Sequence, residues 1–194
     1  MSATNRGTKR KEADFYETPL NAVYTLLDNY TDISPEDHIL EPSAGNGNII
    51  RALRNVGIEN LISAIELRPE EESTLNAIAD NVGIFDFLED TPQFIKYDVI
   101  IGNPPFSLAQ EFIDKSLSLL NPGGRLIFLL RTNFLESRKR FEWWQDKLPT
   151  RLYVLAKRPS FTGKGTDATS YAWFIWEKSR YKDQLLLSQE IRVI

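Results

Sequence analysis

The sequence predicts an α/β fold in which a doubly wound, mainly parallel sheet ends in an antiparallel hairpin. Short apolar runs with strand character alternate with amphipathic segments up to residue 130, which is typical of parallel strands joined by crossover helices. A glycine-containing turn lies between the first strand and the next helix, where doubly wound sheets bind their ligands. No helix separates the last two apolar runs, so those two strands should pair antiparallel.

These patterns place the strands and helices one by one. Thr18 supplies a capping hydroxyl before a first-turn proline, so a helix should begin there and run to about residue 30. Pro69 should open another helix to about residue 79, and the glycines at 123 and 124 should stop a helix and lead into a strand. A third short strand precedes Phe85. The remaining strands are expected at 38–41, 61–65, 97–101, 125–130, 151–156 and 170–176, and the remaining helices at 46–56, 108–120 and 136–147.

Composition sets the domain organisation. A chain of 194 residues with 42% hydrophobic residues is the size of one domain with one sizeable core. We expect that domain at 13–180, between a basic, disordered tail at 1–12 and a C-terminal tail at 181–194. There is no cysteine, and the single histidine, His38, cannot build a metal site alone, so we expect no metal. Without a secretion signal or a membrane-length apolar run, the protein should be soluble and cytoplasmic, with no membrane partner.

Charge is unevenly distributed along the chain. The net charge is −4, but residues 12–98 carry 18 acids against four bases, whereas residues 125–164 carry ten bases against three acids. Such runs are usually solvated faces, and the alternative is a surface that faces a polyanion. Charge alone favours neither interpretation.

The first candidate site is the turn Glu41-Pro42-Ser43-Ala44-Gly45-Asn46-Gly47, which follows a strand and opens a helix. Its small residues let the backbone approach a ligand closely. The turn departs from the dinucleotide-binding pattern G-x-G-x-x-G, because an acid precedes it and the third glycine is missing. A carboxylate here repels a pyrophosphate, whereas the cationic sulfonium and amino group of S-adenosyl-L-methionine tolerate or attract one.

Acids at two later strand ends strengthen this interpretation. Glu66 lies 19 residues beyond Gly47, at the spacing where an acid accepts hydrogen bonds from ribose hydroxyls. Asp86 could accept the adenine amine of the cofactor while a neighbouring aromatic, such as Phe87, packs against the adenine ring. Singly, Glu66 could be a helix-start carboxylate and Asp86 a turn residue. Their order at successive strand ends favours a cofactor site.

The strongest signal is Asn103-Pro104-Pro105-Phe106, directly after the strand at 97–101. The lone pair of the adenine N6 amine is delocalised into the ring, so the amine attacks poorly until acceptors on its hydrogens favour tetrahedral nitrogen. The Asn103 side-chain carbonyl and the Pro104 backbone carbonyl can supply those acceptors, and the prolines fix the loop. Phe106 offers a ring on which a flipped base can stack. A rigid turn is the alternative for a bare N-P-P, but its place at the end of the fourth strand favours catalysis.

From about residue 15 to residue 178, the chain resembles the small, stand-alone, adenine-specific DNA methyltransferases carried by bacteriophages. These are class I S-adenosylmethionine-dependent methyltransferases with an NPPF catalytic loop, so the resemblance implies a Rossmann-like, seven-stranded sheet. The segments 41–47 and 103–106 match the family's glycine turn and catalytic loop, and Glu66 and Asp86 match its ribose and adenine acids. The leading motif at 15–19 implies cofactor contacts from Tyr16, Thr18 and Pro19, and Asn103 should face both cofactor and target.

The match is looser after the sixth strand. There, Arg158-Pro159-Ser160-Phe161 corresponds to a stretch whose aromatic faces the target base. We therefore expect the loop at 157–169 to form part of the substrate cleft, with Phe161 on the flipped adenine opposite Phe106. Arg158 and Lys164 should meet DNA phosphates.

Several alternatives stay open at this stage. Many relatives carry a separate target-recognition domain, which is not expected here, and their catalytic loop often begins with Asp rather than Asn. Asn103 points to the subset that shares this loop with RNA and protein methylases, so adenine in structured RNA is the main alternative substrate. A glutamine methyltransferase and an inactive nucleic-acid-binding module are less favoured, and the protein could be a monomer or a weak homodimer.

Overall fold

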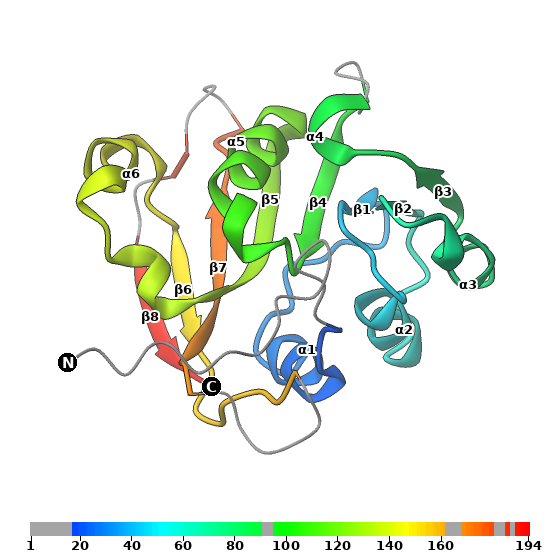
Figure 1. Cartoon of the computed structure of the whole chain (residues 1–194), viewed down its shortest axis with the longest axis horizontal. Coiled ribbons are helices and arrows are strands. Elements are labelled where there is room, and N and C mark those ends of the chain that lie inside the picture. Colours follow the sequence, from blue (N-terminus) through cyan, green and yellow to red (C-terminus); the bar gives the residue numbers. More distant parts are fainter. Residues whose placement is uncertain (1–16, 91–94, 162–167, 181–184, 187–188) are drawn as a thin grey trace.

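The computed structural model describes residues 17–90, 95–161, 168–180, 185–186 and 189–194. Its centre is an eight-stranded sheet with the strand order β3-β2-β1-β4-β5-β7-β6-β8. Figure 1 shows these strands running from β3 at one end of the molecule to β8 at the other. The predicted α/β architecture is confirmed, with one strand more than the predicted seven.

The first five strands pair parallel and make up the doubly wound part of the sheet. They are β1 (Ile39–Glu41), β2 (Ile62–Glu66), β3 (Asn81–Ile84), β4 (Tyr97–Gly102) and β5 (Leu120–Arg131). β5 begins earlier than predicted, because Leu120 already pairs with Tyr97 before the register shifts and Val99 pairs with Arg125. The glycines expected to precede the strand therefore form an irregularity inside it, with Gly123 at a φ of 82°.

The predicted antiparallel hairpin is present and is extended by a further strand. β7 (Tyr171–Glu177) pairs antiparallel with both β5 and β6 (Arg151–Val154). Residues expected to be part of a C-terminal tail instead form β8 (Glu190–Val193), which pairs parallel with β6. Ile191 and Val193 are 74% and 71% exposed, so β8 is held by its backbone ladder more than by apolar burial.

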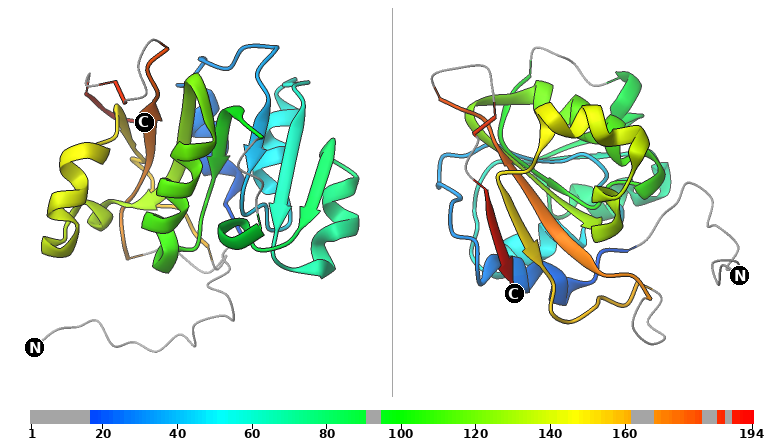
Figure 2. Two further views of the ribbon diagram at one scale, coloured as in Figure 1. Left: turned by 90° about the horizontal axis from the view of Figure 1, so that it is seen from above. Right: turned by 90° about the vertical axis from the view of Figure 1, so that its left-hand side faces the viewer.

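Helices cover both faces of the sheet, as Figure 2 shows in its end-on view. One core lies under α1 (Leu20–Leu27), α2 (Asn48–Asn55) and α3 (Glu72–Asn76). The other lies under α4 (Phe87–Asp90), α5 (Ala109–Leu119) and α6 (Phe141–Lys147). Successive residues of a strand point to opposite faces, so Ile39 joins the first core and Leu40 the second.

Two predicted helix starts are wrong in detail. Pro19 is the N-cap residue of α1 and no side chain caps the helix, so Thr18 does not serve as its capping hydroxyl. Pro69 opens a three-residue 3-10 turn, Pro69–Glu71, and α3 ends at Asn76 rather than near residue 79. No helix in the described residues is long and apolar enough to cross a membrane.

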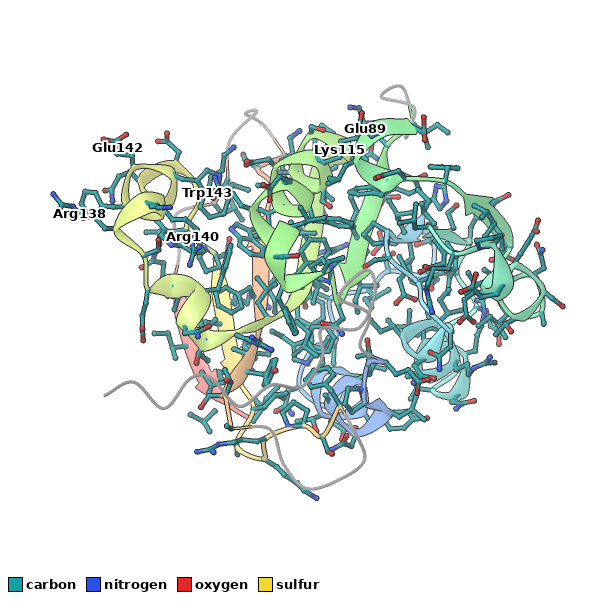
Figure 3. The ribbon with its side chains drawn as sticks, viewed as in Figure 1. Glu89, Lys115, Arg138, Arg140, Glu142 and Trp143 are labelled. Carbon is teal, nitrogen blue, oxygen red and sulfur yellow. The ribbon has the colours of Figure 1, made fainter. Side chains whose placement is uncertain are left out.

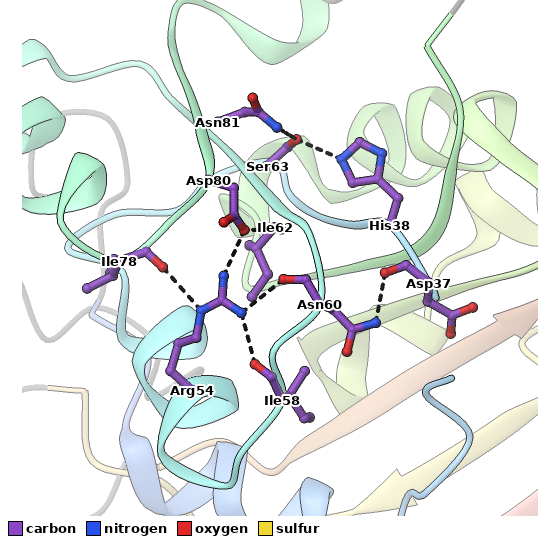
Figure 4. A network of polar contacts seen from close by, with 10 residues as sticks. All are labelled: Asp37, His38, Arg54, Ile58, Asn60, Ile62, Ser63, Ile78, Asp80 and Asn81. Carbon is purple, nitrogen blue, oxygen red and sulfur yellow. Dashed lines mark hydrogen bonds and ion pairs between the residues drawn. The ribbon is translucent and has the colours of Figure 1, made fainter. Parts of the chain in front are cut away.

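A polar network fastens the amino-terminal edge of the parallel strands (Figure 4). Arg54 at the end of α2 donates to the backbone oxygens of Ile58 and Asn60, each at 2.9 Å, and to Asp80 at 2.8 Å. Asp80 also accepts from the backbone N–H of Ile62 at the start of β2. Nearby, His38 Nε2 lies 2.8 Å from Ser63 Oγ. The opposite, carboxyl-terminal edge is where doubly wound sheets bind their ligands.

Candidate active site

The carboxyl ends of the parallel strands meet at one cavity of about 440 Å3. That volume lies within the range of roughly 300 to 1,000 Å3 that is typical of small-molecule sites. Its lining includes ten residues predicted from the sequence: Thr18, Pro42, Ser43, Ala44, Gly45, Glu66, Asp86, Phe87, Asn103 and Pro105. Five other predicted residues that the structure describes near this edge lie outside the lining: Pro19, Glu41, Gly47, Pro104 and Phe106.

The glycine turn between β1 and α2 forms one wall. Gly45 and Gly47 adopt φ values of 56° and 79°, in the left-handed region that favours glycine. A side chain at Gly47 would also displace the terminal methyl group of Ile78. These two glycines therefore let the chain turn tightly, with Gly45 at the cavity surface.

Glu66, the last residue of β2, borders the cavity and is already hydrogen-bonded within the chain. Its Oε2 accepts from the Gly45 backbone N–H at 2.7 Å, and its Oε1 accepts from the backbone N–H and Nε of Arg68 at 3.1 and 2.9 Å. A carboxylate can accept about four hydrogen bonds, so one position remains, on Oε2. A bidentate ribose contact of the kind expected from the sequence would require the Arg68 guanidinium to move.

Glu41, the last residue of β1, lies behind the glycine turn and is 2% exposed. Burial raises the pKa of its carboxyl well above the ordinary value, the negative charge of Glu66 raises it further, and a hydrogen bond from the Ile50 backbone lowers it. Its Oε2 has no hydrogen-bond partner among the described residues. The side chain is thus a buried acid beside the turn, although the sequence suggested that it would face the ligand.

Asp86 and its aromatic neighbours close another side of the cavity. Asp86 Oδ1 accepts from the Leu88 backbone N–H at 2.8 Å and so begins α4. Phe87 is 2% exposed and its ring centroid lies 5.0 Å from that of Phe112, so it is chiefly a core residue at the cavity floor. Phe85 is half-buried, also lines the cavity, and is a second aromatic that could pack against an adenine ring.

The loop after β4 adjoins the glycine turn. Ser43 Oγ donates to the Asn103 backbone oxygen at 3.4 Å. A Cβ atom at Gly102 would lie 3.3 Å from Pro42, so the two loops approach closely there. Asn103 and Pro105 line the cavity, whereas Pro104 is buried. The structure therefore brings together the two motifs that the sequence singled out.

Phe106 lies outside the cavity lining and belongs to an aromatic cluster, which we define as Phe106, Phe161 and Tyr171. The Phe106 and Phe161 centroids are 6.2 Å apart with their planes at 85°. Tyr171 lies 5.8 Å from Phe106 and 4.9 Å from Phe161. A base sandwiched between two rings needs them parallel and roughly 7 Å apart, so the expected sandwich requires Phe161 or Phe106 to rotate.

The predicted phosphate contacts are only partly described. Arg158 is exposed, and its Nη1 donates to the Ala168 backbone oxygen at 3.5 Å across the loop. Tyr16 and Lys164, together with the tail at 1–12, lie outside the described residues. In the basic run that precedes α6, Arg138 points outward while Arg140 lies against the body of the protein (Figure 3), where it donates to the Phe134 backbone oxygen.

Sequence reasoning missed several residues that line the cavity. Arg68 and Asn48 are polar, and Leu67, Leu108 and Phe112 are apolar. Asn46 was part of the predicted turn but was given no role of its own, and it also lines the cavity. Glu17 was quoted within the leading motif but given no role, and it lines the cavity too. The strand-end rule could have found Leu67 and Arg68, which follow Glu66 directly, whereas Phe112 sits inside α5 and gave no such signal.

Comparisons with known proteins agree with this architecture. No family model matches the chain. It is 30% identical over 100 residues to the type II methyltransferase M.CvrRI of Paramecium bursaria Chlorella virus XZ-6E. The matched region covers 50% of this chain and 26% of that protein. The matched half of the chain thus corresponds to about a quarter of the viral relative's length.

Two solved structures share the fold over most of the chain. A Listeria monocytogenes protein described as a class I S-adenosylmethionine-dependent methyltransferase matches with a TM-score of 0.66 at 15% identity, over 90% of this chain and 64% of that one. The type ISP restriction-modification enzyme LlaBIII bound to DNA matches with a TM-score of 0.63 at 15% identity, over 96% of this chain and 20% of that one. The chain therefore has the fold of the class I S-adenosylmethionine-dependent methyltransferases.

Proposed function

We propose that this protein transfers a methyl group from S-adenosylmethionine to the N6 amine of adenine in DNA. The observation that carries the proposal is the meeting of the glycine turn, Glu66 and the Asn103 loop at one cavity. Each feature alone has an ordinary structural explanation. Their convergence at the carboxyl ends of β1, β2 and β4 is what a doubly wound sheet offers to a ligand.

The cavity suits S-adenosylmethionine in size and in chemistry. Among the described residues, three acids, Glu17, Glu66 and Asp86, line the cavity together with one cation, Arg68, so a positively charged ligand is favoured. Apolar side chains, including Phe85, offer a surface for an adenine ring. We assign Glu66 to the ribose hydroxyls and Asp86 to the cofactor's adenine amine. When bound, the cofactor supplies an electrophilic methyl group.

The Asn103–Phe106 loop would hold the target amine. The Asn103 side-chain carbonyl and the Pro104 backbone carbonyl can accept the two amine hydrogens, which favours a tetrahedral nitrogen with a localised lone pair. Neither Pro104 nor Pro105 has a backbone N–H, and both have a fixed φ, so the loop keeps its shape. The methylated nitrogen releases its proton readily, so no general base with a shifted pKa is needed at this position.

Two of the similar proteins support DNA as the substrate. The viral relative is a type II methyltransferase, and LlaBIII is a restriction-modification enzyme bound to DNA. The excess of bases in residues 125–164 is compatible with a polyanion. We expect Arg158 and Lys164 to meet phosphates, and Phe161 to leave its edge-on contact with Phe106 when a base enters.

A substrate comparison tests this proposal. Radiolabelled methyl transfer from S-adenosylmethionine would be measured on duplex DNA, single-stranded DNA, total RNA and protein, and each product would be digested to identify the modified unit. We expect N6-methyladenine in DNA. Label in RNA adenine or in protein glutamine would overturn the assignment of DNA as the substrate. If the protein binds the cofactor but labels none of these substrates, it is a binding module and not an enzyme that acts on them.

A further inference from the structure

Arg131 is the last residue of β5, the one parallel strand whose carboxyl end has no role in the site described above. The other four strands end at, or within two residues of, Glu41, Glu66, Asp86 and Asn103. Ligand-handling groups in doubly wound sheets gather at this edge. Arg131 therefore has the position of a functional residue, although the sequence marked it only as one of several bases.

Its contacts connect it directly to the catalytic loop. The guanidinium carbon of Arg131 lies 4.7 Å from the centroid of the Phe106 ring. Its Nε donates to the Tyr171 hydroxyl at 3.3 Å. Arg131 and Tyr171 are also paired residues in the β5–β7 ladder, and Tyr171 is fully buried. The sheet thus fixes the backbones of both Arg131 and Tyr171. The Arg131 guanidinium covers one face of the Phe106 ring.

The geometry points to stacking rather than charge alone. Arg has a flat, delocalised guanidinium that stacks on aromatic faces, whereas the ammonium of Lys is a compact point charge. The covered face of Phe106 is closed to a base, so a stacked base has at most the other face. The orientation of the ring then depends on Arg131 and on the aromatic cluster of Phe106, Phe161 and Tyr171.

We propose that Arg131 is a positioning residue for the target base, which acts by stacking on Phe106 and fixing the ring on which that base is received. This inference rests on the proposed function, since it assumes that Phe106 receives an extruded adenine. Arg131 itself takes no part in bond making, and Tyr171 orients its guanidinium.

The stack can be tested without DNA. Melting temperatures would be measured for Arg131→Met, Phe106→Leu and the double variant. The change in the double variant should differ from the sum of the two single changes by about 1 to 4 °C, as expected for one cation–π contact. Arg140 provides a matched control, because its guanidinium lies 4.4 Å from the Phe134 ring, outside the catalytic loop. Arg140→Met and Phe106→Leu should be additive. Additive effects of Arg131→Met and Phe106→Leu would overturn the stack.

Measurements of kcat distinguish a role of the flat Arg131 guanidinium from a role of its positive charge alone. We expect Arg131→Lys and Arg131→Met to lower kcat on DNA alike, by about 10- to 100-fold, with cofactor affinity and the salt dependence of DNA binding unchanged. Arg140→Lys should keep the parental kcat. Full activity in Arg131→Lys, or a loss confined to KM with a flatter salt dependence, would show a phosphate contact and overturn the proposal.

These two tests also separate this inference from the proposed function. If the parent protein methylates no adenine, the proposed function fails while the unfolding measurements still decide whether Arg131 stacks on Phe106. If the parent methylates adenine and the Arg131 variants turn over normally, only the inference about Arg131 fails.

Discussion

The two edges of the parallel sheet both contain arginine–carboxylate pairs, but the pairs have different roles. At the amino-terminal edge, Arg54 pairs with Asp80 at 2.8 Å and Arg125 pairs with Asp37 at 2.8 Å. At the carboxyl-terminal edge, Arg68 pairs with Glu66 at 2.9 Å, and both side chains border the cavity. An arginine–carboxylate pair is therefore a fastening at one edge and part of a binding surface at the other.

The difference lies in what surrounds each pair. The Arg54 guanidinium also donates to three backbone oxygens, including that of Ile78, so its donors are used within the protein. Around Glu66, by contrast, Oε2 keeps room for one more hydrogen bond among the residues that the structure describes, and within the same residues the Oε2 of the buried neighbour Glu41 has no hydrogen-bond partner. Satisfied polar groups stabilise the fold, whereas groups left for a ligand cost stability. Five changes would sharpen or break this comparison.

Asn103→Ala should have the largest effect on catalysis. We expect kcat for methyl transfer to fall by at least about 100-fold, because the amide acceptor acts on the target amine as charge develops. Cofactor affinity should stay within about twofold, which single-turnover kinetics and calorimetry would measure. A large loss of cofactor affinity instead would make Asn103 a cofactor residue.

Glu66→Ala should weaken S-adenosylmethionine binding by roughly 5- to 150-fold, corresponding to about 1 to 3 kcal/mol for a hydrogen-bonded carboxylate. Calorimetry is the direct measurement. Glu71→Gln is a suitable control, since Glu71 also pairs with Arg68, at 3.3 Å, but lies outside the cavity lining. Equal losses in both variants would mean that the position of Arg68, and not the carboxylate of Glu66, controls affinity.

Arg54→Met should act on stability alone. It leaves the backbone oxygens of Ile58 and Asn60 and the carboxylate of Asp80 without their donor, so we expect a loss of about 2 kcal/mol. For a domain of this size the melting temperature should fall by roughly 4 to 8 °C. At a temperature where the variant is folded, its kcat and cofactor affinity should match those of the parent. A selective loss of either would show that the amino-terminal edge is coupled to the function of the carboxyl-terminal edge.

Glu41→Gln should stabilise the protein at neutral pH. Because the pKa of Glu41 is raised in the folded protein, its protonated form is favoured there, and the resulting stability is present below the ordinary pKa and lost as the pH rises through the raised value. Gln does not titrate. We therefore expect similar melting temperatures near pH 4 and a gain of about 1 to 4 °C in the variant near pH 7.

The control for this change is Glu142→Gln, which removes one exposed negative charge from α6. A gain of the same size in that variant would point to overall charge rather than to burial at position 41. If Glu41→Gln also weakens cofactor binding, the carboxylate at the end of β1 contributes to function at the expense of stability.

His38→Gln should have the smallest effect. Burial lowers the pKa of His38, whose ring lies near Ser63 at the amino-terminal edge, so the neutral ring is favoured in the folded protein. That contribution is present above about pH 6.5 and is lost as the pH falls through the lowered value. Melting temperatures should differ by no more than about 1 °C at pH 8, and kcat should be unchanged. Loss of turnover without unfolding would contradict a mechanism that needs no general base.

The sequence was most informative where function and local structure coincide. Runs such as Val99-Ile100-Ile101 are apolar on both faces, which requires helices on both sides and hence a doubly wound sheet. The glycine turn and the Asn103 loop were found because a positive φ and a fixed proline backbone have few alternatives. These features depend on neighbours in the chain, so the sequence by itself determined them.

Tertiary structure decided what depends on residues far apart in the chain. β8 was missed because its side chains stay exposed and only pairing with β6 makes it a strand. The engagement of Glu66 by Gly45 depends on a hydrogen bond between residues 21 positions apart, and the contact of Arg131 with Phe106 requires β5 and the catalytic loop to be adjacent. Local sequence sets which groups are available at a strand end, but only the folded chain decides which of them are already satisfied and which are left for a ligand.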